Sequence, residues 1–282
     1  MAARVLGPRA LRVLACAALA LAVLVSCAQK VDTANPAPPA APARPNLSGF
    51  WNLDVRIPRD TDLMSKVGPN TVFLDDTGPV EFPAGNFGGL ILKPAAIEAA
   101  KKWNPYDQLT MQNACKAPTI VYSMQGPFPI EIFQSESFIV IKLEYYDLVR
   151  LVFLDGRQPE ADYPDSKVGF SAGHWEGSTL VVETTHLEAG TITNNGLDHT
   201  ESVRVIERFK LGQDGQTLLS TQEFEDPAVL DNRGVRFIAW RKQAGQHVFP
   251  YECDPGFAGN YKPPAGKPSA VKPKPAAEAP RR

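Results

Sequence analysis

Gly169-Phe-Ser-Ala-Gly-His-Trp-Glu-Gly-Ser-Thr-Leu-Val-Val-Glu-Thr-Thr-His186 consists of two β-type runs that meet at Glu176-Gly177. Val and Thr are frequent in the second run and favour strands, while a Gly at the reversal favours a tight turn between antiparallel strands. The stretch therefore predicts a β-hairpin. His174, Trp175 and Glu176 stand side by side near its tip, so the tip is the first place to look for chemistry.

Similar β-type runs lie on both sides of this hairpin. After a first strand at 47–55, they cover 130–134, 137–145, 148–154, 168–175, 179–186, 202–211, 216–223 and 235–242. Turn pairs such as Asp155-Gly156 and Asp214-Gly215 separate them. Repeated short strands with such turns predict a mainly β domain. We expect an antiparallel meander that closes into a barrel-like or lipocalin-like sheet.

One short helix is expected at 94–103. It would begin at Pro94, because proline is tolerated in the first helical turn, and Asn104-Pro105 would end it. Its buried stripe would contain Ile97 and Ala100 with Trp103 or Ala96. The segment 58–89 is rich in Gly, Pro and Asp and is expected to be a loop.

Composition and the N-terminal segment indicate an exported protein. The 282 residues carry a formal net charge of −2, with 44% hydrophobic and 21% charged residues, so the chain is of ordinary soluble composition and a nucleic-acid partner is not expected. Three arginines precede the apolar run Val13–Val25, which is too short to span a membrane but is typical of a signal peptide. Residues 1–26 are therefore expected to be removed.

The apolar run ends in Leu24-Val25-Ser26-Cys27, which resembles the lipobox of bacterial lipoproteins. Cys27 would then carry lipid and be the new N-terminus, and Ala28 after it favours the outer membrane, with the protein facing the periplasm. Ordinary secretion with an incidental Cys is the alternative. We expect a Pro/Ala-rich tether at 27–45, one β-rich domain at 46–261, a disordered basic tail at 262–282, and membrane contact through the lipid anchor only.

Four cysteines remain to be assigned. Cys16 leaves with the signal peptide and Cys27 is used by lipid, so Cys115 and Cys253 remain as a pair in an oxidising compartment. A disulfide between them is the economical prediction. A reactive thiol or half of a metal site is the alternative, although neither Cys lies in a metal-binding spacing.

Several segments resemble a large family of exported bacterial proteins for which no activity is established. The resemblance spans roughly 92–253, and one departure is Ser178, where the family pattern has Asp. It implies a β-rich fold with paired cysteines and carries over no catalytic residue. The motifs that carry it are Lys93-Pro94, Trp103-Asn-Pro105, Cys115 followed by Pro118, Gly126-Pro-Phe-Pro-Ile-Glu-Ile132, Asp155-Gly156, Gly173-His-Trp-Glu-Gly-Ser-Thr-Leu-Val-Val-Glu-Thr184, Glu201-Ser-Val-Arg-Val-Ile-Glu-Arg-Phe209 and Pro250-Tyr-Glu-Cys253.

Two charged residues fall on apolar faces of predicted strands. In 202–211, Glu207 alternates in phase with apolar residues, while the basic residues fall on the other face. In 148–154, Arg150 shares a face with apolar residues in the same way. An ion pair between them inside the sheet is one interpretation. The other is that Glu207 is an acid or base in a pocket, with a pKa raised by burial, and that Arg150 contacts a ligand.

Histidine and glutamate recur in pairs two residues apart. His174 with Glu176, and His199 with Glu201, would each project from one side of an extended backbone and could supply a general base and acid. A metal held by these residues with His186 is an alternative, but the spacing matches no established motif, so no metal is expected. His186 and His247 are expected at the surface. There is no Gly-rich phosphate loop either, and we expect no cofactor.

Three function classes remain open. The first is binding of a small, largely apolar molecule in a β-rich pocket, because closed sheets of this size can enclose one ligand. Most aromatic residues should be core, but Tyr145 and Trp175 are candidates to line such a pocket. The second class is a cofactor-free lyase, isomerase or hydrolase that uses the His and Glu residues. The third is a structural or interaction protein of the envelope.

Overall fold

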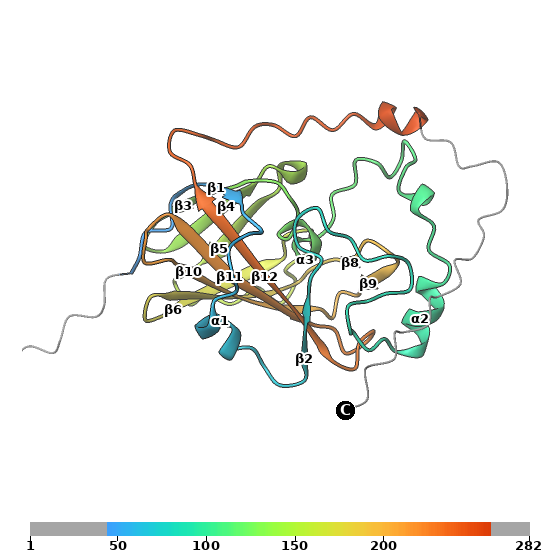
Figure 1. The fold of residues 1–282 in the computed structure, drawn as a ribbon, viewed down its shortest axis with the longest axis horizontal. Helices are drawn as coiled ribbons and strands as arrows, with labels where there is room; N and C mark the ends of the chain where they lie inside the picture. The colour runs from blue at the N-terminus through green and yellow to red at the C-terminus, as the bar shows by residue number, and fades with distance from the viewer. Residues whose placement is uncertain (1–43, 261–282) are drawn as a thin grey trace, which may run out of the picture. The chain divides into compact units, whose positions relative to one another are not determined.

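Strand β12 hydrogen-bonds to β1, and this pairing closes a sheet of nine strands into a barrel (Figure 1). The computed structural model describes residues 44–260, so the predicted signal peptide, Cys27 with nearly all of the tether, and almost the whole of the predicted tail lie outside the described residues. The barrel strands, in their order around the sheet, are β1 (Gly49–Leu53), β3 (Ile130–Gln134), β4 (Phe138–Leu143), β5 (Val149–Phe153), β6 (Phe170–Glu176), β7 (Thr179–Thr185), β10 (Arg204–Leu211), β11 (Thr217–Glu225) and β12 (Arg233–Lys242).

The predicted mainly β, barrel-like fold is confirmed. The hairpin predicted at 169–186 is β6–β7, in which Glu176 pairs with Thr179 across the two-residue turn Gly177-Ser178. Gly177 has φ +61°, a left-handed conformation that glycine adopts without strain. Each of the other predicted strands is also present, with ends that differ by a few residues.

Two pairings depart from a simple antiparallel meander. β5 and β6 are parallel, because the chain returns from the end of β5 to the other end of the barrel before β6 begins. The short strand β2 (Thr71–Leu74) lies parallel to the first half of β12, outside the closed ring. β1 occupies the same edge of β12 along its second half, so both halves of this long strand are paired on both sides.

The expectations for the segment between β1 and β3 need correction. The expected loop at 58–89 contains the short helix α1 (Thr61–Ser65) as well as β2. The expected helix is α2 (Pro94–Ala100), with proline in its first turn as predicted. Its buried residue is Ala96, whereas Ile97 is exposed. A helix of two turns has only a narrow buried stripe, so the predicted stripe of Ile97 and Ala100 with Trp103 or Ala96 was too wide.

One end of the barrel, here called the plugged end, is covered by irregular chain. The short helix α3 (Ile120–Ser123) lies across it, and the inward-facing Gln222 and Arg236 donate hydrogen bonds to the carbonyls of Ile120 (3.0 Å) and Val121 (2.9 Å). The hairpin β8 (Gly190–Thr193) with β9 (Leu197–His199), which was not predicted, lies beside α3 (Figure 1). The interior is therefore closed on this side.

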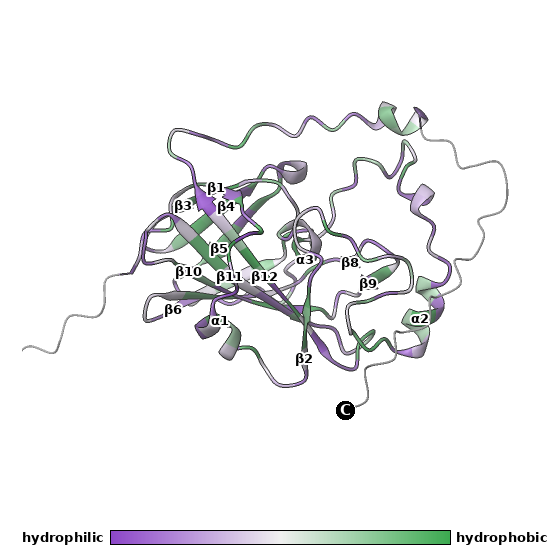
Figure 2. Ribbon diagram, viewed as in Figure 1, coloured by the Kyte–Doolittle hydropathy of each residue, from purple (hydrophilic) through white to green (hydrophobic). Residues whose placement is uncertain are grey.

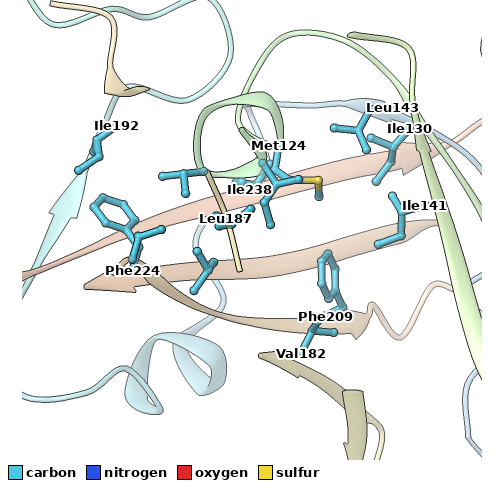
Figure 3. Packing of buried hydrophobic residues seen from close by; sticks show 14 of the residues in the cluster. Met124, Ile130, Ile141, Leu143, Val182, Leu187, Ile192, Phe209, Phe224 and Ile238 are labelled. Carbon is cyan, nitrogen blue, oxygen red and sulfur yellow. The ribbon is translucent and has the colours of Figure 1, made fainter. Parts of the chain in front are cut away.

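The barrel interior is filled by side chains. Phe209 and Val182 from neighbouring strands point inward with Ile238, and Met124 from the chain that covers the plugged end packs among them (Figure 3). The largest side chains with almost no exposed surface are aromatic residues and two arginines: Trp51, Trp240, Phe209, Phe224, Arg150 and Arg236. Because these side chains are closely packed, they fill the interior of the barrel.

After β12 the chain runs back over the outside of the barrel as a strap, residues 243–260. Figure 1 shows this orange-red segment passing along the barrel to the short helix η3 (Pro255–Asn260). Carboxylates of the barrel accept its backbone N–H groups: Glu144 from Phe249 (3.2 Å) and Asp147 from Tyr251 (3.0 Å). The predicted disulfide between Cys115 and Cys253 is confirmed, with their Cα atoms 5.8 Å apart. Within residues 44–260 no helix has the length and hydrophobicity to cross a membrane.

Candidate functional site

A cleft of about 290 Å³ lies at the plugged end, next to the disulfide. Segments far apart in the sequence build it: the loop before α3, the short helix η2 (Tyr145–Asp147), strand β8 and the strap. Its side chains are mostly aromatic, amide or cationic, and those that bear on the argument are Lys116, Tyr122, Tyr145, Tyr146, Lys167 and Asn194.

The aromatic wall of this cleft is fixed by ring stacking. Tyr145 stacks on Phe128 with ring centroids 4.5 Å apart and meets Tyr146 edge-on at 4.7 Å. Tyr251 of the strap packs against Tyr146 at 4.6 Å. The Tyr146 hydroxyl also donates to the carbonyl of Ala114 (2.9 Å), beside the disulfide. The wall is therefore held from two sides, by η2 and by the strap.

The backbone at this wall is unusual. Tyr146 and Asp147 both have left-handed φ angles, 55° and 54°. Non-glycine residues adopt this conformation at a cost and keep it only where the surroundings hold it. Here the ring contacts of Tyr146 and the hydrogen bond from Tyr251 to Asp147 supply that support. Tyr145, which precedes this strained pair, lines the cleft.

Ionisation of the tyrosines is suppressed. Burial raises the pKa of Tyr122 above its usual value, and its hydroxyl hydrogen bond to Glu81 raises it further. Burial likewise raises the pKa of Tyr145, with smaller effects from the hydroxyls of Tyr146 and Tyr251. Both phenols are therefore neutral at ordinary pH, so they can contact or hydrogen-bond a ligand but are poor general bases.

Two lysines bring positive charge to the cleft. Lys167 is paired with Glu188, with its Nζ 2.8 Å from Glu188 Oε1. Lys116 is exposed and has no ion-pair partner among residues 44–260. The uncommitted positive charge at this cleft is therefore at Lys116, one residue from the disulfide.

His199 lies directly behind the cleft wall and is buried, with 1% of its surface exposed. Its Nδ1 is 3.0 Å from the carbonyl of Thr200, which can only accept, so Nδ1 carries the proton. Nε2 then accepts from the Thr119 hydroxyl (2.7 Å). Burial lowers the pKa of His199, so the ring is neutral. Gly190 covers the pair, and a Cβ there would lie 3.2 Å from Nε2.

Glu207 and Arg150 form an ion pair inside the barrel, with 2.5 Å between Glu207 Oε2 and Arg150 Nη2. Arg150 also donates to Ser171 (2.9 Å) and Thr184 (2.7 Å) on β6 and β7. Both charged side chains are essentially inaccessible. This geometry agrees with the interpretation of the two residues as an ion pair inside the sheet. Neither residue lines the cleft.

The His–Glu pairs predicted from spacing have different surroundings. His174 and Glu176 do lie together, 3.3 Å apart, but on the exposed outer surface beyond the other end of the barrel. His199 and Glu201 do not share a side, which corrects the prediction. The chain turns after β9, so the imidazole is buried while Glu201 is exposed.

The remaining predicted residues also lie apart from Tyr145. Trp175 points into the barrel and is half-buried, with its Nε1 buried and without a hydrogen-bond partner among the described residues. His186 has φ 57° and hydrogen-bonds the Thr185 hydroxyl. His247, on the strap, contacts Glu131 at 2.6 Å. Of the three predicted ligand contacts, Tyr145 is in the cleft and Arg150 and Trp175 are not.

Sequence reasoning missed Arg236, which organises the plugged end. Its guanidinium binds Asp76 in a bidentate manner (2.8 and 2.7 Å). It also donates to the carbonyl of Ile192 on β8 (2.6 Å) and to that of Val121 on α3. The signal that identified Glu207 was present here too, because Arg236 alternates in phase with the apolar Ile238 and Trp240.

No three His, Cys, Asp or Glu side chains within residues 44–260 are grouped as a metal ion would require. Comparison with known protein families and with curated proteins found no match for the chain. The functional argument therefore rests on the geometry of the cleft.

Proposed function

We propose that this chain is a lipid-anchored protein at the periplasmic face of the bacterial outer membrane, and that it binds a small, largely apolar ligand in the cleft at the plugged end. The lipobox-like sequence that ends in Cys27 supports the proposed location. The observation that carries the binding proposal is the rigid aromatic wall formed by Tyr145 and Tyr146. Small-molecule sites are typically concave, lined by aromatic side chains, and equipped with few polar groups that fix orientation.

The expected location of the ligand differs from the sequence-based expectation of a pocket inside the sheet. The interior contains Arg150, Glu207 and tightly packed aromatic residues, whereas the cleft is open to solvent. A flat apolar or aromatic group would stack on the tyrosine rings, where edge and face contacts add to the burial of apolar surface. Lys116 and Asn194 at the cleft would then be available to a polar substituent of the ligand.

Native mass spectrometry of the protein purified from envelopes tests this function. We expect a retained organic mass that is lost in Tyr145→Leu. Tyr163→Leu is the matched control, because Tyr163 packs on Phe170 and His186 on the outer surface, away from the cleft. A protein that carries no organic mass, and whose melting temperature responds to no apolar or aromatic compound, would rule the proposal out.

Acid–base catalysis is the second candidate, and the Thr119–His199 pair favours it. A neutral imidazole that accepts a hydroxyl proton is the arrangement that activates a nucleophile or serves as a general base. Gly190 lines the cleft and packs directly on the pair. A lyase, isomerase or hydrolase acting here would lose turnover in His199→Gln and keep it in His174→Gln, whereas equal turnover in both would exclude His199 as the base.

A further inference from the structure

The outer face of β3, β4 and β5 is apolar where a barrel surface is ordinarily polar. Phe133 on β3 lies opposite Val140 on β4, and Val140 lies opposite Leu151 on β5, so the three form one row across the strands. Phe138 and Val149 flank the row. The exposed fractions of the four most accessible are 48% (Phe133), 41% (Phe138), 53% (Val149) and 39% (Leu151). We call these four residues the apolar face.

Exposed apolar side chains are concentrated on this face. Four of the twelve exposed large apolar side chains of the described residues belong to three adjacent strands. β4 and β5 consist mostly of hydrophobic residues, which are green in Figure 2. β5 even inverts the usual pattern, because Arg150 points into the barrel while Val149 and Leu151 point out. Contiguous exposed apolar surface of this kind marks an interaction site.

The chain enters the domain beside this face. Gln134, the last residue of β3, donates its Nε2 to the carbonyl of Pro45 (3.1 Å) and accepts the backbone N–H of Leu47 with its Oε1 (2.9 Å). Gln134 faces the barrel interior while Phe133 faces out, so the chain enters the domain at the end of the strand that carries the apolar face. Cys27 precedes Pro45 by 18 residues, so a lipid on Cys27 lies at most about 60 Å from this point along a fully extended chain.

We propose that the apolar face docks on the phospholipid surface to which Cys27 is anchored. The inference rests on the lipid anchor of the proposed function, and it adds a second membrane contact to the one expected from the lipid alone. Phe and aliphatic side chains partition into the boundary between headgroups and acyl chains. A tether makes the second contact intramolecular, so a face of only a few side chains suffices. Lys142, opposite Val149, places a cation at its margin, which favours anionic headgroups.

Spin-label accessibility on the full lipidated protein tests the docking. The protein is purified from membranes and reconstituted in vesicles of phosphatidylethanolamine and phosphatidylglycerol. Labels are attached at Phe138→Cys and Leu151→Cys, with Gln213→Cys in the exposed turn between β10 and β11 as the control. We expect the first two labels to collide mainly with oxygen, which concentrates in the bilayer, and the control label to collide mainly with a water-soluble nickel complex.

Each other outcome has a separate meaning. Protein that fails to float with the vesicles refutes the lipid anchor, and with it the basis of the docking. Protein that floats while the labels at the apolar face report water overturns the docking alone. Dipolar broadening between labels on different molecules would show that the occupant is a second copy of the chain, and this also overturns the proposal.

A charge variant tests the same contact without moving the label. With the label at Val149→Cys, Leu151→Glu is compared with Gln213→Glu. Because a carboxylate disfavours insertion, we expect the oxygen-to-nickel collision ratio at 149 to fall several-fold in the first variant and to stay unchanged in the second. Equal ratios in the two variants would contradict docking through β5. Both replaced side chains are exposed, so the fold is expected to tolerate either change.

Discussion

Glu207 and Arg150 bury opposite charges at the centre of the barrel, where the loss of hydration is costly for each. Their mutual attraction offsets this cost only in part, since Arg150 Nη1 has no hydrogen-bond partner among the described residues. The pair connects β5 to β10 over the inner faces of β6 and β7, and so helps to specify how these four strands curve around the interior. Replacing both residues with apolar side chains should therefore lower the free energy of unfolding less than replacing only one of them.

Glu207→Gln should lower the free energy of unfolding by about 3–5 kcal/mol, because it leaves the Arg150 charge buried without a counter-ion. The double variant Arg150→Met with Glu207→Leu should recover most of that loss. Denaturant unfolding monitored by fluorescence measures both. If the double variant is as unstable as the single one, hydrogen bonds of the pair outweigh its desolvation cost.

His199 should make stability depend on pH. Burial lowers its pKa in the folded state below the unfolded value, so as pH falls through about 6.5 the unfolded chain takes up a proton that the folded protein does not. Stability is therefore fully present above that pH and declines below it. The free energy of unfolding measured from pH 7.5 to 5.0 should fall more steeply in the native protein than in His199→Gln.

Among the elements, the parallel contact of β5 with β6 depends on Gly173. A Cβ at this position would lie 2.8 Å from Val152 Cγ1 and 3.0 Å from Leu154 Cδ2. We expect Gly173→Ala to destabilise the protein by about 1–3 kcal/mol through overcrowding. Gly126→Ala, where the nearest atom would be 3.6 Å away, is the control. Similar melting temperatures for the two variants would show that β5 can move aside.

The strap is attached to the barrel by one covalent bond and several hydrogen bonds. Cys115 and Cys253 close a loop with a sequence separation of 138 residues. In the chain-entropy account a loop of this length contributes about 5 kcal/mol, so Cys115→Ser with Cys253→Ser should lower the free energy of unfolding by a similar amount. The same variant should weaken ligand binding, because Tyr251 would no longer be held in its packing contact with Tyr146 of the aromatic wall. Unchanged protease sensitivity of the strap would show that its hydrogen bonds suffice.

For the whole molecule, local patterns predicted the strands but not their arrangement. Strand β10 was evident because apolar residues alternate with charged ones, and β7 was evident because Val and Thr are frequent in it. Hairpin β8–β9 was missed because its strands are short and contain Gly and Asp, and because Asn194 and Asn195 lie between them; these residue types usually indicate loops. The parallel β5–β6 contact and the closing β1–β12 pair join segments with no local signal of pairing.

The cleft was predictable only in part for the same reason. Tyr145 was a candidate because aromatic residues can line a cavity, but its neighbours Lys116, Asn194 and Phe257 come from distant segments. Their proximity depends on the disulfide and on the Arg236 cluster at the plugged end. Glu207 and Arg150, in contrast, were found from alternation alone, because a charged residue in phase with apolar ones must meet a partner inside the sheet.

The pairing of β1 with β12 also means that β1 is synthesised long before the strand that pairs with its edge. β12 begins 180 residues after β1 ends. At a translation rate of about 5–20 residues per second, the first strand waits roughly 10–40 s for the partner that covers its edge. An unpaired strand edge is a template for aggregation throughout that interval. A chain that ends before Arg233 lacks β12, so it cannot complete the ring and keeps the edge of β1 unpaired.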